Sequence, residues 1–249
     1  MLIDSHCHID RYSTPEKVVR DAGAAKICVV AVTNLPSHFV IARDRLRSSA
    51  YVKPALGMHP LHAASGIREL ALFRRLATQA DLIGEIGLDF SPEGLAQKAI
   101  QERLFDEVLS AISDRPRFIT LHSRGAANAV VRALQRHGIR RAVFHWFTGS
   151  REELQAAVEA GHGVSINPAM LRTASGMRIL EAAPPEAILV ESDGPFVQYE
   201  SRAIRPSDVA VVYCALSERW KVSVPEAIDI VKVNSSRYGL KFPNVDQVI

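Results

Sequence analysis

Cysteine, aromatic side chains, net charge and long apolar runs are all scarce in this sequence of 249 residues. Three cysteines without paired spacing exclude a disulfide framework and a cysteine-based zinc site, and they indicate a reducing compartment. A formal charge of +3 is too small to indicate nucleic-acid binding by itself. No stretch approaches the roughly 18 apolar residues of a membrane span, and no secretory signal opens the chain, so we expect a soluble, cytoplasmic protein.

Short apolar runs alternate with longer amphipathic segments along the chain, and 47% of the residues are hydrophobic. This length and pattern predict an α/β fold and one domain spanning residues 1–249. The predicted strands are Leu2–His8, Lys26–Thr33, Val52–Gly57, Leu82–Leu88, Phe118–His122, Ala142–His145, Gly163–Ile166 and Ala187–Ser192. The predicted helices are Pro15–Asp21, Ser37–Ser48, Glu69–Thr78, Leu95–Ile112, Ala126–His137, Arg151–Ala160, Gly176–Ala183, Ser207–Trp220 and Pro225–Arg237.

Eight strands, each followed by a helix, favour a (β/α)₈ TIM barrel, although a doubly wound open sheet has the same local pattern. Histidines and carboxylates fall at or just beyond the carboxyl ends of the predicted strands. They are His6, His8, Glu85, His122, His145 and Asp193. Because the carboxyl ends of barrel strands converge on one mouth, we expect these side chains to meet there as a metal site.

His6 and His8 are two residues apart on a strand, so their imidazoles point to the same side and Cys7 points away. That spacing suits a shared metal ion, whereas a solitary pair of this kind is more often a surface or core feature. Glu85 lies in a strand that looks buried, where a charged carboxylate is costly unless it is ion-paired or bound to a cation. Asp89 follows that strand and either supports a ligand or caps the next loop.

His122, His145 and Asp193 each have an ordinary alternative, as core histidines and as a turn-forming aspartate. Together with the other three residues they supply enough nitrogen and oxygen ligands for two divalent ions, with the Glu85 carboxylate able to bridge them. Two ions about 3.5 to 4 Å apart are a recurring solution for phosphodiester and amide hydrolysis. Asp193 would then accept the proton of the attacking water.

Six ordered blocks of the sequence resemble the TatD-type metal-dependent deoxyribonucleases, a branch of the amidohydrolase-like barrels. The blocks are Asp4–Asp10, Gly57–Pro60, Gly84–Asp89, His122–Arg124, His145–Gly149 and Glu191–Phe196. The resemblance runs from Ile3 to about Leu240. It implies hydrolysis of DNA phosphodiester bonds, acting on single strands from an end.

The resemblance also implies a division of roles. His6, His8, Glu85 and Asp193 would hold one ion, and Glu85, His122 and His145 the other, with Asp193 also serving as general base. His59 and Arg124 would face the substrate phosphate, unless Arg124 instead pairs with a carboxylate. The identity of the ions stays open among zinc, manganese and magnesium.

Some positions depart from the usual family pattern: Trp146, Gly194 and the segment 163–170. These departures resemble the TatD-like member of bacterial Qat anti-phage cassettes, and they imply possible partners among the other cassette proteins. Trp146 and other aromatic residues after the strand ends could stack on bases of a single strand, and Arg205 could contact its phosphates. Packing under the loops and a solvated loop are the alternatives for the aromatic residues and for Arg205.

Two other functions fit the same residues. A two-metal amidohydrolase or lactonase acting on a small metabolite would use the same core against a carbonyl group. A metal-bound scaffold that binds a partner or a nucleic acid without cleaving it would need no catalysis, but no catalytic position is missing from this sequence.

Overall fold

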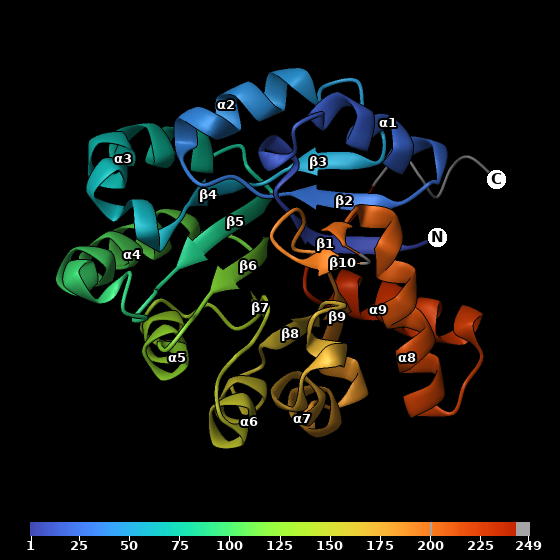
Figure 1. Cartoon of the computed structure of the whole chain (residues 1–249). Helices are drawn as coiled ribbons and strands as arrows, with labels where there is room; N and C mark the ends of the chain where they lie inside the picture. Colours follow the sequence, from blue (N-terminus) through green and yellow to red (C-terminus); the bar gives the residue numbers. More distant parts are fainter. Residues whose placement is uncertain (200, 243–249) are drawn as a thin grey trace.

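The computed structural model describes residues 1–199 and 201–242, and parallel strands alternate with helices along this length (Figure 1). The parallel strands are β1 (Ile3–Cys7), β2 (Cys28–Ala31), β3 (Val52–Pro54), β4 (Leu56–Met58), β5 (Leu82–Gly87), β6 (Phe118–His122), β7 (Val143–Phe144), β8 (Gly163–Ile166) and β9 (Ile188–Val190). The α-helices are α1 (Pro15–Ala24), α2 (Pro36–Arg45), α3 (Ala63–Ala77), α4 (Lys98–Ile112), α5 (Ala127–Arg136), α6 (Arg151–Glu159), α7 (Ala174–Ala182), α8 (Ala210–Trp220) and α9 (Val224–Arg237).

The strands form a closed ring with the helices outside it (Figure 1). Strands β1, β2 and β3 pair in that order, and β4 to β9 pair in sequence order. β3 and β4 are consecutive pieces of one strand that flank Ala55. The ring closes beyond the end of β9, where Asp193 N donates to His6 O at 2.9 Å and His8 N donates to Gly194 O at 2.8 Å. This closure confirms the TIM barrel and excludes the open, doubly wound sheet.

Along a strand, successive side chains point in turn to the barrel interior and to the surrounding helices. In β2 and its extension, Val29 and Ala31 pack with Val18 of α1, whereas Val30 and Val32 pack in a separate cluster inside the ring. This inner cluster joins one side chain from most strands to Tyr238, Leu240 and Phe242 of the carboxyl-terminal segment. The amino-terminal end of the barrel is therefore filled with apolar side chains, and the polar groups gather at the other end.

Helix α3 begins at Ala63, earlier than the predicted Glu69. A short 3₁₀ turn, Pro60–His62, leads into it and is capped by the His59 side chain, which accepts a hydrogen bond from Leu61 N at 3.1 Å. The first turn, with its alanines and Gly66, has no apolar stripe from which a helix could be predicted. The structure also contains a short antiparallel hairpin that was not predicted, β10 (Gln198–Tyr199) and β11 (Arg202–Ala203).

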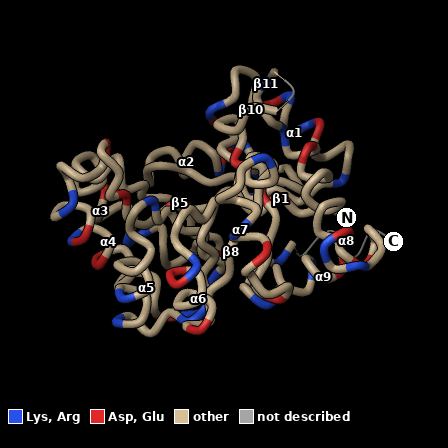
Figure 2. The backbone as a smooth tube through the Cα atoms, turned by 60° about the horizontal axis from the view of Figure 1, so that its bottom comes forward, with Lys and Arg blue, Asp and Glu red and all other residues tan. Residues whose placement is uncertain are grey.

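The helical shell carries basic and acidic residues interspersed along its length (Figure 2). Within residues 1–199 and 201–242, no helix combines the length and the apolar character that crossing a bilayer requires.

Gly57 of β4 leaves room for Thr33, which follows β2, to reach Glu85 of β5. A Cβ at this position would lie 1.4 Å from the Thr33 carbonyl oxygen, which accepts a hydrogen bond from Glu85 N at 3.1 Å. We therefore expect Gly57→Ala to lower the free energy of unfolding by about 3 kcal/mol or more, because backbone rather than a flexible side chain must move. The measurement is urea denaturation. Gly23→Ala in α1 is the control, since its Cβ would have 4.0 Å of space; an equal loss in both variants would contradict the prediction.

His162 precedes β8 and is 1% exposed, and its ring centroid lies 5.7 Å from that of Phe144. Neither ring nitrogen has a hydrogen-bond partner among the described residues. Burial lowers the pKa of His162 from 6.5 to about 4. Protonation therefore favours the unfolded chain, and stability is lost as the pH falls from about 6.5 toward 4.

His162→Leu should remove this loss. Between about pH 7 and pH 4.5 the wild type should lose about 2 to 3 kcal/mol more unfolding free energy than the variant, both measured by urea denaturation in chelator. Parallel pH dependences for the two proteins would show that His162 is not the group responsible.

Candidate metal centre

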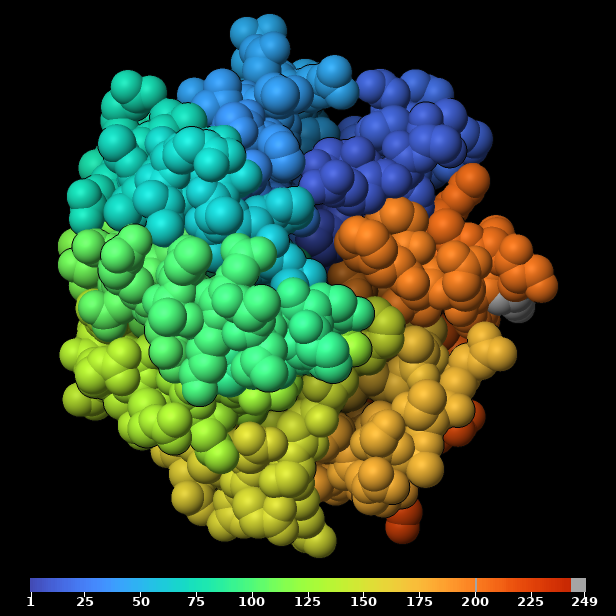
Figure 3. Space-filling view, turned by 60° about the vertical axis from the view of Figure 1, so that its left-hand side comes forward, coloured from blue at the N-terminus to red at the C-terminus, as the bar shows by residue number. Residues whose placement is uncertain are grey.

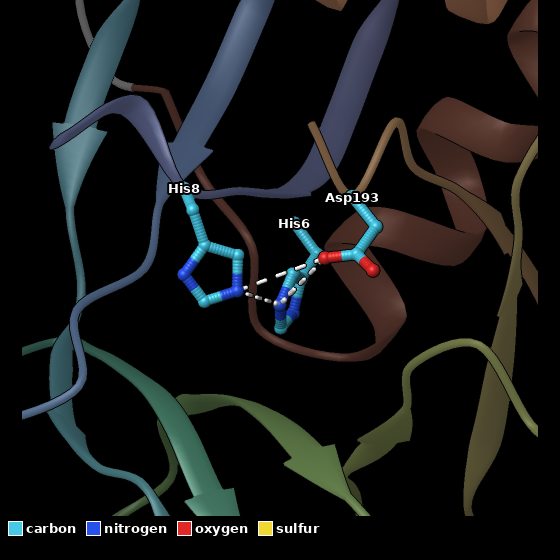
Figure 4. A group of neighbouring side chains, drawn as sticks. All are labelled: His6, His8 and Asp193. Carbon is cyan, nitrogen blue, oxygen red and sulfur yellow. Dashed lines mark hydrogen bonds and ion pairs between the residues drawn. The ribbon is translucent and has the colours of Figure 1, made fainter. Parts of the chain in front are cut away.

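Two histidines at the carboxyl end of β1, His6 within the strand and His8 just after it, form the first part of the centre. His6 and His8 point to the same side, and their Nε2 atoms lie 3.3 Å apart (Figure 4). Cys7 points the other way, with its Sγ 3.6 Å from the Gly194 carbonyl oxygen. The alternation of side chains along a strand places them so, as the sequence predicts. Both imidazoles are buried, at 0% and 2% exposure.

Asp193 faces these two histidines from beyond the end of β9 (Figure 4). Its Oδ1 lies 3.7 Å from His6 Nε2 and 3.6 Å from His8 Nε2. Glu85 of β5 approaches from another side, with Oε2 at 3.7 Å from His6 Nε2 and 3.2 Å from His8 Nε2. Four side chains from three segments thus turn their donor atoms toward one point.

The second oxygen of Glu85 faces three further histidines. Oε1 lies 2.7 Å from His122 Nδ1, 2.8 Å from His145 Nε2 and 3.3 Å from His59 Nε2. The single carboxylate therefore connects both halves of the cluster. His59 was expected to face the substrate phosphate. It lies at the mouth but also against Glu85, so its position suits a metal ligand as much as a phosphate contact.

Hydrogen bonds outside the cluster orient two of its rings. Thr120 Oγ1 lies 2.8 Å from His6 Nδ1, which leaves His6 Nε2 facing the centre. Asp89 Oδ2 lies 2.7 Å from His122 Nε2, which leaves Nδ1 facing Glu85. Asp89 Oδ1 also accepts from Ser91 N at 2.8 Å, so Asp89 both supports a histidine and caps its loop. Carboxylates that hold the far nitrogen of a histidine are the usual outer partners of metal sites.

Sequence reasoning missed the supporting role of Glu191. This buried carboxylate accepts hydrogen bonds from the Ser165 hydroxyl, from Asn167 Nδ2 at 3.1 Å and from Trp146 N at 2.9 Å. It thereby positions the backbone next to His145. The available signal was a charged residue at the end of an apolar strand.

Asp4 of β1 supports the cluster in a similar way, where β1 meets the segment after β9. Its Oδ1 accepts from Ser192 N at 2.9 Å and its Oδ2 from the Ser192 hydroxyl at 2.6 Å, so it positions the residue before Asp193. Burial raises the pKa of Asp4 to about 8. Its sequence signal was a carboxyl group within a predicted strand, two residues before His6.

Gly194 explains one departure from the usual family pattern. The Asp193 backbone has a φ of +48°, and the Gly194–Pro195 peptide bond that follows is cis. A Cβ on Gly194 would lie 1.9 Å from the Tyr12 hydroxyl oxygen, which donates to Ile204 O at 2.6 Å. Glycine is thus required here because Tyr12 crosses under the turn.

The pKa shifts in the cluster indicate that the buried Glu85 carboxylate is stabilised by positive charge. Burial acts to raise the pKa of Glu85, but His59 and His145 above all hold it well below its ordinary range. Burial acts to lower the pKa of His145, and the Glu85 carboxylate raises it well above its ordinary value. Burial also raises the pKa of Asp193 to about 7. Buried imidazolium therefore balances the Glu85 carboxylate, and a metal cation could balance the same charge.

This donor set fits divalent metal ions. Three groups of side chains have donor atoms within 4.8 Å of one another: His6, His8 and Asp193; His6, Glu85 and His145; and His59, Glu85 and His122. Asp193 Oδ1 is buried and lacks a hydrogen-bond partner among the described residues, although it faces two imidazole nitrogens. Imidazole and carboxylate ligands suit zinc and manganese, and carboxylates suit magnesium.

A cavity of about 600 Å³ opens over the cluster. Its lining includes His59 and other cluster residues together with Arg124, Trp146 and Phe196. Arg124 is exposed and its Nη1 pairs with Glu93 Oε2 at 2.9 Å, which is the carboxylate partnership left open by the sequence. Arg205 does not line this cavity: its Nη1 lies 3.4 Å from Asp21 Oδ2 in α1.

Comparisons with known proteins agree with this architecture. The chain is 25% identical over 254 residues to human deoxyribonuclease TATDN3, covering 94% of this chain and 93% of the human protein. It is 31% identical over 206 residues to a Pantoea ananatis protein named 3'-5' ssDNA/RNA exonuclease TatD, covering 78% of each chain. Among solved structures, the Escherichia coli TatD homologue YjjV superposes with a TM-score of 0.84 at 23% identity, covering 96% of this chain and 97% of that one.

A TatD-family hydrolase of Entamoeba histolytica shares the fold with a TM-score of 0.82 at 17% identity, covering 98% of each chain. The sequence model described as TatD related DNase matches residues 3–238, which is nearly the whole chain. The chain therefore belongs to the TatD-related DNase family of hydrolases.

Proposed function

We propose that this protein hydrolyses phosphodiester bonds of DNA with two divalent metal ions, removing nucleotides from an end of a single strand. The observation that carries the proposal is the Glu85 carboxylate, buried between two groups of histidines and in contact with both. The name of the Pantoea ananatis relative, a single-strand exonuclease, supports the same substrate.

Two ligand sets share Glu85 in this proposal. His6, His8, Glu85 and Asp193 would hold one ion, and Glu85, His122 and His145 would hold the other, with zinc, manganese or magnesium as candidates. When bound, such ions polarise the phosphodiester and lower the pKa of a water molecule. Because the ligands come from segments between β1 and the end of β9, we assign this activity to residues 1–249 as one unit.

The chain's own groups then perform the remaining steps. Asp193 Oδ1, which lacks a hydrogen-bond partner among the described residues, accepts the proton of the attacking water. His59 and Arg124 line the cavity where the phosphate would lie, and Arg124 would exchange Glu93 for phosphate oxygens.

The terminal bases would be bound by aromatic side chains at the mouth. Trp146 lines the cavity, and Phe196 is 57% exposed with its ring 4.9 Å from that of His8. Flat exposed rings stack on any base, so they bind a strand without reading its sequence. Arg205 would contribute at most an outer phosphate contact, because it is paired with Asp21 beyond the lining.

Purified protein should shorten labelled single-stranded oligonucleotides, and chelation of metal should abolish this activity. Asp193→Asn and His122→Ala should each lower kcat at least about 100-fold, because proton transfer and ion binding are lost, while the circular dichroism spectrum is unchanged. Metal content of each variant separates the two causes. Asp229→Asn on α9 and His137→Ala at the end of α5 are the matched controls.

Three results would contradict the proposal. Robust hydrolysis of lactones with intact DNA would indicate a small-molecule hydrolase built on the same core. Tight binding of DNA without cleavage by the metal-loaded protein would indicate a binding module. Wild-type turnover by metal-loaded Asp193→Asn would remove Asp193 from the mechanism.

A role in anti-phage defence is the narrower part of the proposal. It rests on Trp146, Gly194 and the segment 163–170, which resemble the TatD-like protein of Qat cassettes. If this assignment is correct, cells carrying the cassette should lose protection in a phage-plating assay when Asp193→Asn replaces the wild type. Full protection by that variant would exclude a role for hydrolysis in defence.

A further inference from the structure

A second cavity of about 560 Å³ lies beside the reaction cavity, between the start of α6 and the length of α7. Both helices follow strands whose carboxyl ends form the mouth, so this groove opens on the same face of the barrel. Trp146 and Thr148 line both cavities. The two spaces are therefore neighbours with a shared wall. Figure 3 shows a furrow between the yellow-green segments and the gold and orange segments of this region.

Cations exceed carboxylates along the groove. Arg151 and Arg178 line it and are exposed, and neither has an ion pair among the described residues. Glu181 is the acidic residue of the lining. The nearby Glu153 carboxylate is already engaged, since it accepts a hydrogen bond from Ser150 N at 2.9 Å. Two unpaired guanidinium groups can therefore meet phosphate oxygens.

Side-chain caps occupy one backbone amide at the start of each of the two helices. In α6 the Ser150 hydroxyl accepts from Glu153 N at 3.2 Å, and in α7 the Thr173 hydroxyl accepts from Gly176 N at 3.1 Å. Each cap occupies one amide, and the positively charged side chains that line the groove are those of Arg151 and Arg178. Arg151 and Arg178 are therefore the side chains that would bind an anion in this groove.

Trp146 is half-buried and lines both cavities, and its backbone conformation is fixed. Its φ is +36°, which is unfavourable for a bulky residue, and its N–H is fixed by Glu191 Oε1 at 2.9 Å. Backbone that adopts such a conformation and is held there by a buried carboxylate is typical of functional positions. The indole is thus presented where one cavity passes into the other.

We propose that this groove is a second binding subsite for single-stranded nucleic acid, occupied by the part of the strand that is not being cleaved. The strand passes over Trp146, and its phosphates contact Arg151 and Arg178. Each cavity has the size of a site for a small ligand, which suits successive single nucleotides and not a duplex. The inference rests on the proposed nuclease function, since it names where the remainder of that substrate lies.

The test compares a long oligonucleotide, which would reach the groove, with a dinucleotide, which would not. The double variant Arg151→Ala/Arg178→Ala should raise KM for oligothymidylate of about twelve nucleotides roughly tenfold and leave KM for the dinucleotide unchanged. The salt dependence of oligonucleotide binding should fall by about 1.4 in log–log slope, from two lost phosphate contacts. Arg151→Lys/Arg178→Lys should restore most of that slope because it retains both charges.

Arg103→Ala/Arg132→Ala is the matched control, since it removes two exposed arginines from α4 and α5 and gives the same net charge. An unchanged KM for the long strand, or an equal rise for the dinucleotide, would overturn the subsite. A wild type that cleaves neither substrate would instead overturn the nuclease function. The two failures are therefore distinguishable.

Discussion

The arrangement of this protein depends on one buried carboxylate. Glu85 is 1% exposed and its two oxygens contact imidazole nitrogens from both halves of the cluster. A carboxylate without compensating positive charge would be strongly destabilising in such a place. Its position is also supported by the backbone, because the Thr33 carbonyl accepts its N–H and Gly57 makes room for that carbonyl. The requirement for cationic partners around Glu85 therefore determines which residues can occupy the neighbouring strand ends.

Inside the barrel, apolar residues lie at the amino-terminal ends of the strands and polar residues at the carboxyl-terminal ends. Phe118, Leu82 and the carboxyl-terminal Leu240 fill the amino-terminal end, and the histidine cluster occupies the other end. The cavity at the mouth therefore gives water and substrate a route to the cluster. Neighbours such as Glu191 and Asp89 are buried and hydrogen-bonded, so they hold the side chains and backbone of the cluster in place.

Much of this architecture follows from short-range pattern. β6 and β8 have the predicted bounds because each is an apolar run with clear ends, and the convergence of His6, Glu85 and His145 follows from parallel strands in a closed ring. The roles of these residues as metal ligands stay predictions.

Features that depend on distant contacts could not be predicted. The Tyr12 hydroxyl under Gly194 joins residues far apart in the sequence, and Arg205 pairs with Asp21 of the distant helix α1. The hairpin β10–β11 has strands of two residues, too short to show alternation. The distance between His59 and Glu85 depends on the 3₁₀ turn that starts at Pro60, which carries no periodic signal.

The seam between β1 and the segment after β9 has a consequence for how the protein matures. The hydrogen bonds that close the ring, Asp193 N to His6 O and His8 N to Gly194 O, are made by the same residues that face one another in the cluster. During synthesis the first two histidines leave the ribosome long before Asp193, so the ring and the complete pocket form together and late. Ions would then be acquired after translation, by a chain that has already closed on itself.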